Sequence, residues 1–160
     1  MFDARFQKFI QGKGYSYFER NLGVAVGGDA LKWMIRNPKN SGKTIYLIRI
    51  LFRNTTATRV QVETIDRPAV ADFATVINTA VPGAITPRRV PQAASIAILS
   101  RVDTGNDFTT SGIWYDDLLA ATSKEVVLGI VLPPDSDVVF GIKVPGGGDT
   151  PIAVPEWYEE

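Results

Sequence analysis

The 160-residue chain carries 17 basic and 17 acidic residues, which gives a formal net charge of zero, and it contains no cysteine and no histidine. These counts exclude disulfide bonds, thiolate nucleophiles, histidine-dependent catalysis and zinc sites built from Cys or His, and no cofactor is expected. Balanced charge also gives the chain no general attraction to nucleic acid or anionic lipid, so neither is expected as a partner.

The N-terminal stretch is aromatic and helical in its spacing. Phe2, Phe6 and Phe9 recur among polar residues, which predicts a short amphipathic helix that would be marginal alone. We therefore interpret residues 1–29 as an arm and residues 30–160 as the folded domain. Because these aromatics are poorly suited to water, the arm either packs on its own domain or docks on another subunit. The residues expected at such an interface are Phe2, Phe6, Phe9, Tyr15, Tyr17 and Phe18.

The first ten residues lack the apolar core of a secretion signal, so secretion by a standard signal peptide is not expected. No run of about 18 apolar residues is present either, which argues against a membrane-spanning helix. We therefore expect no membrane partner.

The strongest strand signal lies at residues 44–53, with the sequence TIYLIRILFR. At a period of two, Tyr46, Ile48, Ile50 and Phe52 form a wholly apolar face, which predicts a central strand with that face toward the core. Further strands are expected at 30–36, 59–66, 94–102, 108–115, 125–132, 138–144 and 152–158. About eight strands without helix-strand alternation predict an all-β fold, and a jelly-roll-like β-sandwich is the favoured architecture.

The connections are predicted from turn residues. Residues 37–43 and the glycines at 146–148 are interpreted as hairpin loops, and 116–121 as a helical turn. Residues 67–92 are rich in proline and poorly periodic, which is typical of a long ordered excursion used in assembly.

Three motifs suggest chemistry, but each has a simpler interpretation. Residues 37–44 end in Gly-Lys-Thr as a P-loop does, yet Asn37 replaces the required glycine and a strand follows instead of a helix. The acidic clusters around Asp103 and Asp135 could bind calcium, although turn formation explains both. A hydrolase with two carboxylates remains an alternative, and its candidate acids are Asp116, Asp117, Glu125, Glu156, Glu159 and Glu160.

The aromatic pairs Trp114-Tyr115 and Trp157-Tyr158 lie at the ends of predicted strands. They could form a platform for stacking on sugars, but aromatics in such positions more often belong to a core or an interface. No catalytic residue is assigned, and the chain is not expected to be an enzyme.

The C-terminal third also carries a resemblance. The run VVLGIVLPP at 126–134, an apolar strand and the ending EWYEE at 156–160, together with IRNP at 35–38 before SGK at 41–43, resemble small virion proteins of tailed bacteriophages of the head-decoration or head-auxiliary type. The resemblance implies a jelly-roll subunit that is made in the host cytoplasm, enters the virion and forms a homo-oligomer, often a trimer. Such a subunit stabilises the capsid without catalysis by binding the major capsid protein or another virion protein. The alternative is a carbohydrate- or receptor-binding β-sandwich module.

Overall fold

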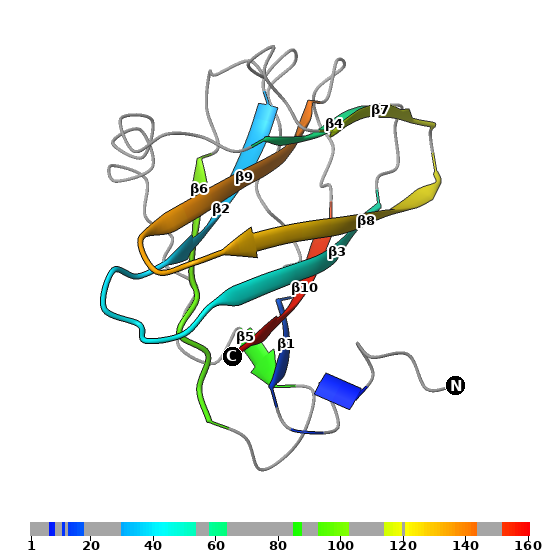
Figure 1. The fold of residues 1–160 in the computed structure, drawn as a ribbon. Helices are drawn as coiled ribbons and strands as arrows, with labels where there is room; N and C mark the ends of the chain where they lie inside the picture. Colours follow the sequence, from blue (N-terminus) through cyan, green and yellow to red (C-terminus); the bar gives the residue numbers. More distant parts are fainter. Residues whose placement is uncertain are drawn as a thin grey trace.

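The computed structural model describes residues 7–8, 11, 13–17, 30–53, 58–63, 85–87, 93–102, 114–119, 121–143 and 152–160. Predictions for Phe2, Phe6, Phe9, Phe18, for the cluster around Asp103 and for the glycines at 146–148 lie outside these residues. The described part is built from β-strands (Figure 1), which confirms the all-β prediction. It includes no helix of the length and hydropathy needed to cross a membrane.

The ten strands form two five-stranded antiparallel sheets. Sheet A has the order β5-β1-β10-β3-β8, and sheet B has the order β6-β2-β9-β4-β7. The strands are β1 (Gly14–Tyr17), β2 (Ala30–Asn37), β3 (Ile45–Arg53), β4 (Thr58–Glu63), β5 (Ile85–Pro87), β6 (Ile98–Val102), β7 (Trp114–Leu118), β8 (Ser123–Leu132), β9 (Ser136–Lys143) and β10 (Ile152–Glu159).

The pairing follows a simple rule along the chain. The first four strands pair with the last four in reverse order, β1 with β10, β2 with β9, β3 with β8 and β4 with β7. Pairing of β10 with β3 joins the first and third of these pairs in sheet A. Pairing of β9 with β4 joins the second and fourth in sheet B. The chain therefore runs as one long two-stranded ribbon whose successive pairs alternate between the sheets, while β5 and β6 add an outer strand to each.

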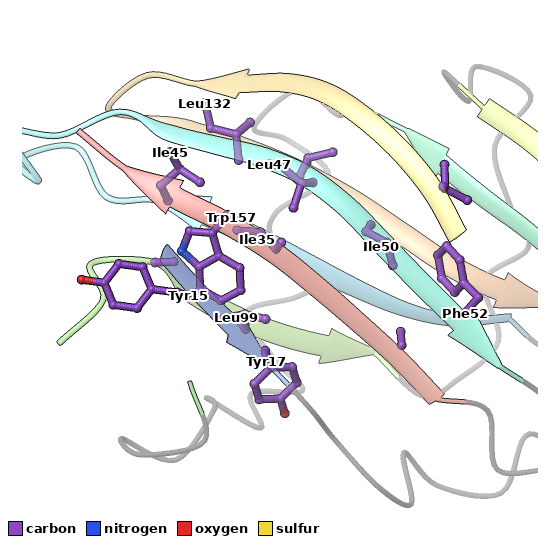
Figure 2. Close-up of a cluster of buried hydrophobic side chains, with 14 residues drawn as sticks. Tyr15, Tyr17, Ile35, Ile45, Leu47, Ile50, Phe52, Leu99, Leu132 and Trp157 are labelled. Carbon is purple, nitrogen blue, oxygen red and sulfur yellow. The ribbon is translucent and has the colours of Figure 1, made fainter. Parts of the chain in front are cut away.

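One hydrophobic core joins the two sheets (Figure 2). Trp157 of β10 is completely buried and stacks on Tyr15 of β1, with 6.1 Å between the ring centroids. Ile35 of β2 and Leu99 of β6 bring side chains of sheet B into the same cluster. Because both sheets contribute to it, burial of this cluster holds them together.

The predicted inward face of residues 44–53 is partly wrong. Ile48, Ile50 and Phe52 are buried as expected, but Ile45 and Leu47 also lie in the core, while Tyr46 is only half-buried. The cause is a β-bulge at Ile48, where the register with both neighbouring strands shifts. An extra residue exchanges the two faces of a strand on one side of the bulge.

The hairpin predicted at residues 37–43 is also wrong, because the flanking strands β2 and β3 lie in different sheets and this connection runs from one sheet to the other. Strands β9 and β10, which flank residues 146–148, likewise lie in different sheets and do not pair with each other. The buried side chain of Asn37 explains the connection from β2 to β3. Its Nδ2 donates hydrogen bonds to the carbonyl oxygens of Lys43 (2.7 Å) and Leu132 (2.8 Å), which fixes the loop against the end of β8.

Two local predictions need correction. The helical turn expected at 116–121 is mostly strand, since β7 continues to Leu118 and only a short turn closed by Thr122 on the Leu119 carbonyl follows. Within the expected arm, Gln7 and Lys8 are helical, but residues Gly14–Tyr17 form β1 between β10 and β5. This strand belongs to sheet A, and the division at residue 30 otherwise stays a prediction.

Candidate interaction surface

The outward side of β10, β3 and β8 is the candidate site, and we call it the outer face. Residues directly opposite each other in antiparallel strands share a face, and the other side of these strands supplies the core. Outward side chains therefore align in cross-strand rows. The rows are Tyr158, Tyr46 and Val131, then Glu156, Arg49 and Val127, then Val154, Leu51 and Glu125.

The outer face is unusually apolar for a solvent-facing surface. The exposed fractions are 64% for Val127, 53% for Val131 and 40% for Leu51. Gly129 lies between the two valines on the same side of β8, and the space around it is open. Grouped apolar side chains that the fold leaves in water are typical of interaction sites.

Two tyrosines close the C-terminal end of the outer face. The rings of Tyr46 and Tyr158 are stacked, with centroids 4.6 Å apart and planes 8° from parallel, and the Nζ of Lys8 lies 5.8 Å from the Tyr158 centroid. Burial raises the pKa of Tyr158 above its ordinary value of 10.0. Stacking and a nearby cation make this a rigid aromatic patch with a polar margin.

An ion-pair network crosses the middle of the outer face. Arg49 Nε lies 2.6 Å from Glu156 Oε2, and a second guanidinium nitrogen lies 3.2 Å from Glu125 Oε1. The hydrogen bond to Glu156 is the main cause of a pKa of Arg49 above its ordinary value. Glu156 is 9% exposed and Glu125 44% exposed as side chains. The Arg49–Glu156 pair is therefore expected to contribute to stability, whereas the exposed Arg49–Glu125 pair is mostly screened by water.

The N-terminal helical turn is tied to the end of β10. Lys8 and Lys13 both bind the carboxylate of Glu160, the latter at 3.2 Å. These hydrogen bonds, chiefly that of Lys8, hold the pKa of Glu160 below its ordinary value. The turn thereby borders the tyrosine pair with two cations.

Glu159 faces the opposite way, into the protein. Its side chain is 1% exposed and accepts hydrogen bonds from the Ser95 hydroxyl, the Ile96 amide (3.0 Å) and the Trp157 indole (3.3 Å). Lys43 Nζ lies 3.5 Å away. Four donors on one buried carboxylate hold the segment before β6 against β10, which is a structural arrangement.

The acids of the cluster around Asp135 have structural roles. Asp137 pairs with Arg36 at 2.8 Å, and Asp135 occupies a turn with φ of 74°, as the turn interpretation predicts. Among the described residues, no group of three or more acids could hold a metal ion. Glu125 and Glu156 share Arg49 instead of forming an acid-base pair.

The segment that resembles a P-loop does not lead into a helix. Strand β3 begins at Ile45, and Gly42 allows the turn before it with φ of 66°. Ser41 Oγ accepts a hydrogen bond from the Lys43 amide at 3.4 Å and donates one to the Lys43 carbonyl at 3.1 Å. These contacts organise the crossing between the sheets, and the non-nucleotide interpretation of this loop fits them.

Of the six predicted interface residues, the structure describes two. Tyr15 is 2% exposed and Tyr17 7% exposed, and both belong to the core of their own chain. The Tyr15 hydroxyl also donates a hydrogen bond to the Ala93 carbonyl at 3.0 Å. These two side chains therefore pack within their own chain, and a contact between the arm and another subunit stays a prediction.

Sequence reasoning missed the outer face itself. Residues 126–132, VVLGIVL, are apolar at odd and even positions alike, although only the even ones turn inward. A strand that is apolar on both faces is typical of one that is covered on both faces. This pattern could have predicted that the outward side of β8 binds a partner.

Comparisons with protein-family models, with curated proteins and with solved structures give no match to this chain.

Proposed function

We propose that this chain is a non-catalytic structural subunit of a virion, a jelly-roll protein that forms a homo-oligomer and binds a phage capsid through its outer face. The observation that carries the proposal is the apolar outer face of β10, β3 and β8, where Val127 is 64% and Val131 53% exposed. A surface that does not serve the core, on a fold without a described metal cluster, is suited to assembly.

The strand order supports the jelly-roll part of the proposal. A jelly roll is a pair of interlocked Greek keys, equivalent to one long antiparallel ribbon rolled into two sheets. The pairs β1 with β10, β2 with β9, β3 with β8 and β4 with β7 follow that pattern. Strands β5 and β6, which lie between β4 and β7 in the chain, extend the edges.

The general use of this architecture supports the assembly part. Jelly rolls recur in viral capsid proteins and in lectins, which are the two classes considered from the sequence. A subunit that binds many equivalent positions on a particle can use a modest interface, because attachment is multivalent. The outer face offers exposed apolar side chains, with the Arg49 network across its middle and Lys8 and Lys13 at its margin, which suits such an interface.

The test has two stages. Molar mass is first measured by light scattering during size exclusion, where an oligomer that persists on dilution is expected. The protein is then sedimented with purified heads of tailed phage, wild type against Tyr158→Ser on the outer face. We expect wild type to sediment with the heads and the variant to bind at least about tenfold more weakly. A monomer that stays in the supernatant contradicts the proposal.

Truncation is a poor test of the N-terminal residues. Removing residues 1–20 would delete β1 and with it Tyr15 and Tyr17 from the core. Replacing Phe2 and Phe6 by serine leaves β1 intact, and loss of assembly in this folded variant is the result expected if the arm contributes.

The tyrosine pair supports a second candidate, a carbohydrate- or receptor-binding module. Tyr46 and Tyr158 are half-buried and offer ring edges beside Lys8, whereas Trp157 is buried and cannot stack on a sugar. A glycan array read with wild type and Tyr158→Ala separates the two functions, because a module of this kind retains a glycan signal that the variant loses.

A further inference from the structure

Strand β8 is the longest edge strand of the two described sheets. Of the four edges in the two described sheets, β5 has three residues, β6 and β7 have five each, and β8 has ten. Among the described strands, β8 pairs only with β3 (Figure 1). Its far edge therefore presents a row of backbone donors and acceptors to any strand that can lie beside it.

This edge lacks the usual protection. Natural sheets discourage pairing at an edge with charged residues, proline or short strands. Residues 126–132 of β8 contain no charge and no proline, and Val127 and Val131 project from them into solvent. An uncharged β-branched segment of this length is prone to pair with another strand. A stable protein is therefore expected to cover it.

We infer that β8 pairs in antiparallel fashion with β8 of a second copy of this chain, about a two-fold axis that passes beside Val127. The pairing joins two five-stranded sheets into one continuous sheet of ten strands. This inference rests on the proposed self-assembly and names the contact that produces it. Because a two-fold contact is closed, it gives an even number of subunits instead of the trimer that the family resemblance implies.

The distribution of charge along β8 is compatible with a second copy and selects its antiparallel orientation. The only charged residues, Lys124 and Glu125, lie at the start of the strand. An antiparallel copy brings this charged end against the uncharged end of its partner. A parallel copy in register would place Lys124 on Lys124 and Glu125 on Glu125, and like charges directly opposite are destabilising.

The alternation of β8 then fixes the register. Odd-numbered residues face outward and even-numbered residues inward, so faces match only if odd residues oppose odd ones. With Val127 opposite Val127, Glu125 lies across from Gly129 and Ser123 across from Val131. The space around Gly129 is open, and it can accept the longer glutamate side chain. The central valine pair adds a favourable β-branched contact.

Two substitutions test the contact by molar mass. Val127→Lys places a charge on the axis, while Leu119→Lys is the matched control, because Leu119 is 72% exposed and lies outside β8. Both positions are exposed, so both variants are expected to fold, which circular dichroism checks. Two lysines directly opposite each other should raise the dissociation constant of the two-fold contact at least about tenfold. The control should keep the wild-type mass.

Single cysteines test the register in the wild-type background, since the chain has no native cysteine. In Val127→Cys the two thiols lie opposite each other and should form a disulfide-linked dimer on mild oxidation. In Val131→Cys they lie eight residues apart along paired strands, about 26 Å, which is far beyond disulfide reach. Leu119→Cys measures random collision.

The outcomes separate this inference from the proposed function. Crosslinking of Val127→Cys alone, with a reduced mass for Val127→Lys, supports the β8 pair. An oligomer that survives Val127→Lys and crosslinks none of the variants, or all of them equally, overturns the β8 pair and leaves self-assembly intact. A wild-type monomer at every concentration removes self-assembly and the pair with it. A crosslinked dimer that does not bind phage heads keeps the pair and rejects the virion role.

Discussion

The two faces of sheet A use the same three strands for different purposes. On the inner face, Trp157, Ile50 and Leu132 are at most 2% exposed and pack into the common core. On the outer face, neighbouring positions of these strands hold Val127 and Val131, which are more than half exposed. The inner face accounts for folding, whereas the outer apolar side chains contribute little to it. Apolar residues that the fold does not need indicate a surface kept for binding.

The two buried glutamates of β10 repeat this contrast. Glu159 on the inner side accepts hydrogen bonds from Ser95, Ile96 and Trp157. Glu156 on the outer side pairs with Arg49, which is itself 38% exposed. The inner carboxylate depends on fixed protein donors, while the partner of the outer one retains access to water and to Glu125.

The largest effect is expected from removing the central aromatic of the inner face. Trp157→Ala should lower the free energy of unfolding by about 3–5 kcal/mol, because it leaves a cavity beneath Tyr15. Val131→Ala, on the outer face of the adjoining row, should change it by no more than about 0.5 kcal/mol. Urea denaturation of both variants, at a protein concentration where the subunits are dissociated, measures the two free energies of unfolding. Equal losses would mean that the outer face is part of the folding core.

The next largest effect is the difference in the free energy of unfolding between variants of the two buried glutamates of β10. Glu159→Ala should cost about 3 kcal/mol, because it leaves the Ile96 amide, the Trp157 indole and the Ser95 hydroxyl without their buried acceptor. Glu156→Ala should cost about 1 kcal/mol, since Arg49 keeps Glu125 and contact with solvent.

Glu159→Gln is the matched control in that denaturation series. It keeps an acceptor oxygen, so its loss should fall between wild type and the alanine variant. A larger loss for Glu156→Ala than for Glu159→Ala would reverse the contrast between the two sides of β10.

Much of this organisation could be predicted from period-two patterns. Strands β3, β8, β9 and β10 lie where the sequence has runs of apolar residues, and β3 has a neighbouring strand on each side as expected. The inward face of β3 could not be predicted in full, because a single extra residue at Ile48 reverses the sides before it. The pairing of the strands could not be predicted from the sequence either. Gly and Pro mark a chain reversal, but a reversal within one sheet and a crossing between sheets use the same residues.

The candidate site, too, could be predicted only in part from the sequence. The excess of apolar residues in β8 was visible in the sequence, but neither the exposure of its outward side chains nor its position at the edge of sheet A could be inferred from it. The donors around Glu159 could not be inferred, since Ser95 and Ile96 are more than sixty residues away along the chain. Contacts of this range depend on the topology, and local patterns do not encode them.

The smallest expected effect concerns pH at the margin of the outer face. The pKa of Glu160 is held below its ordinary value of 4.5, first by Lys8 and then by Lys13. A carboxylate whose pKa is lower in the folded state stabilises that state at pH values above the ordinary pKa. The contribution is lost as pH falls through the folded pKa. Acidification from the ordinary pKa of 4.5 through the lowered pKa of Glu160 should therefore release the N-terminal turn from β10 before it affects the core.

Carboxyl chemical shifts followed by NMR during acid titration measure this pKa, and amide exchange at β1 reports the release. Lys8→Gln should raise the pKa of Glu160 toward 4.5, and Lys13→Gln should raise it less, following the order of their contributions. If Glu160 titrates in wild type at its ordinary value, the lysine contacts do not persist in solution. The outer face would then extend only to the tyrosine pair.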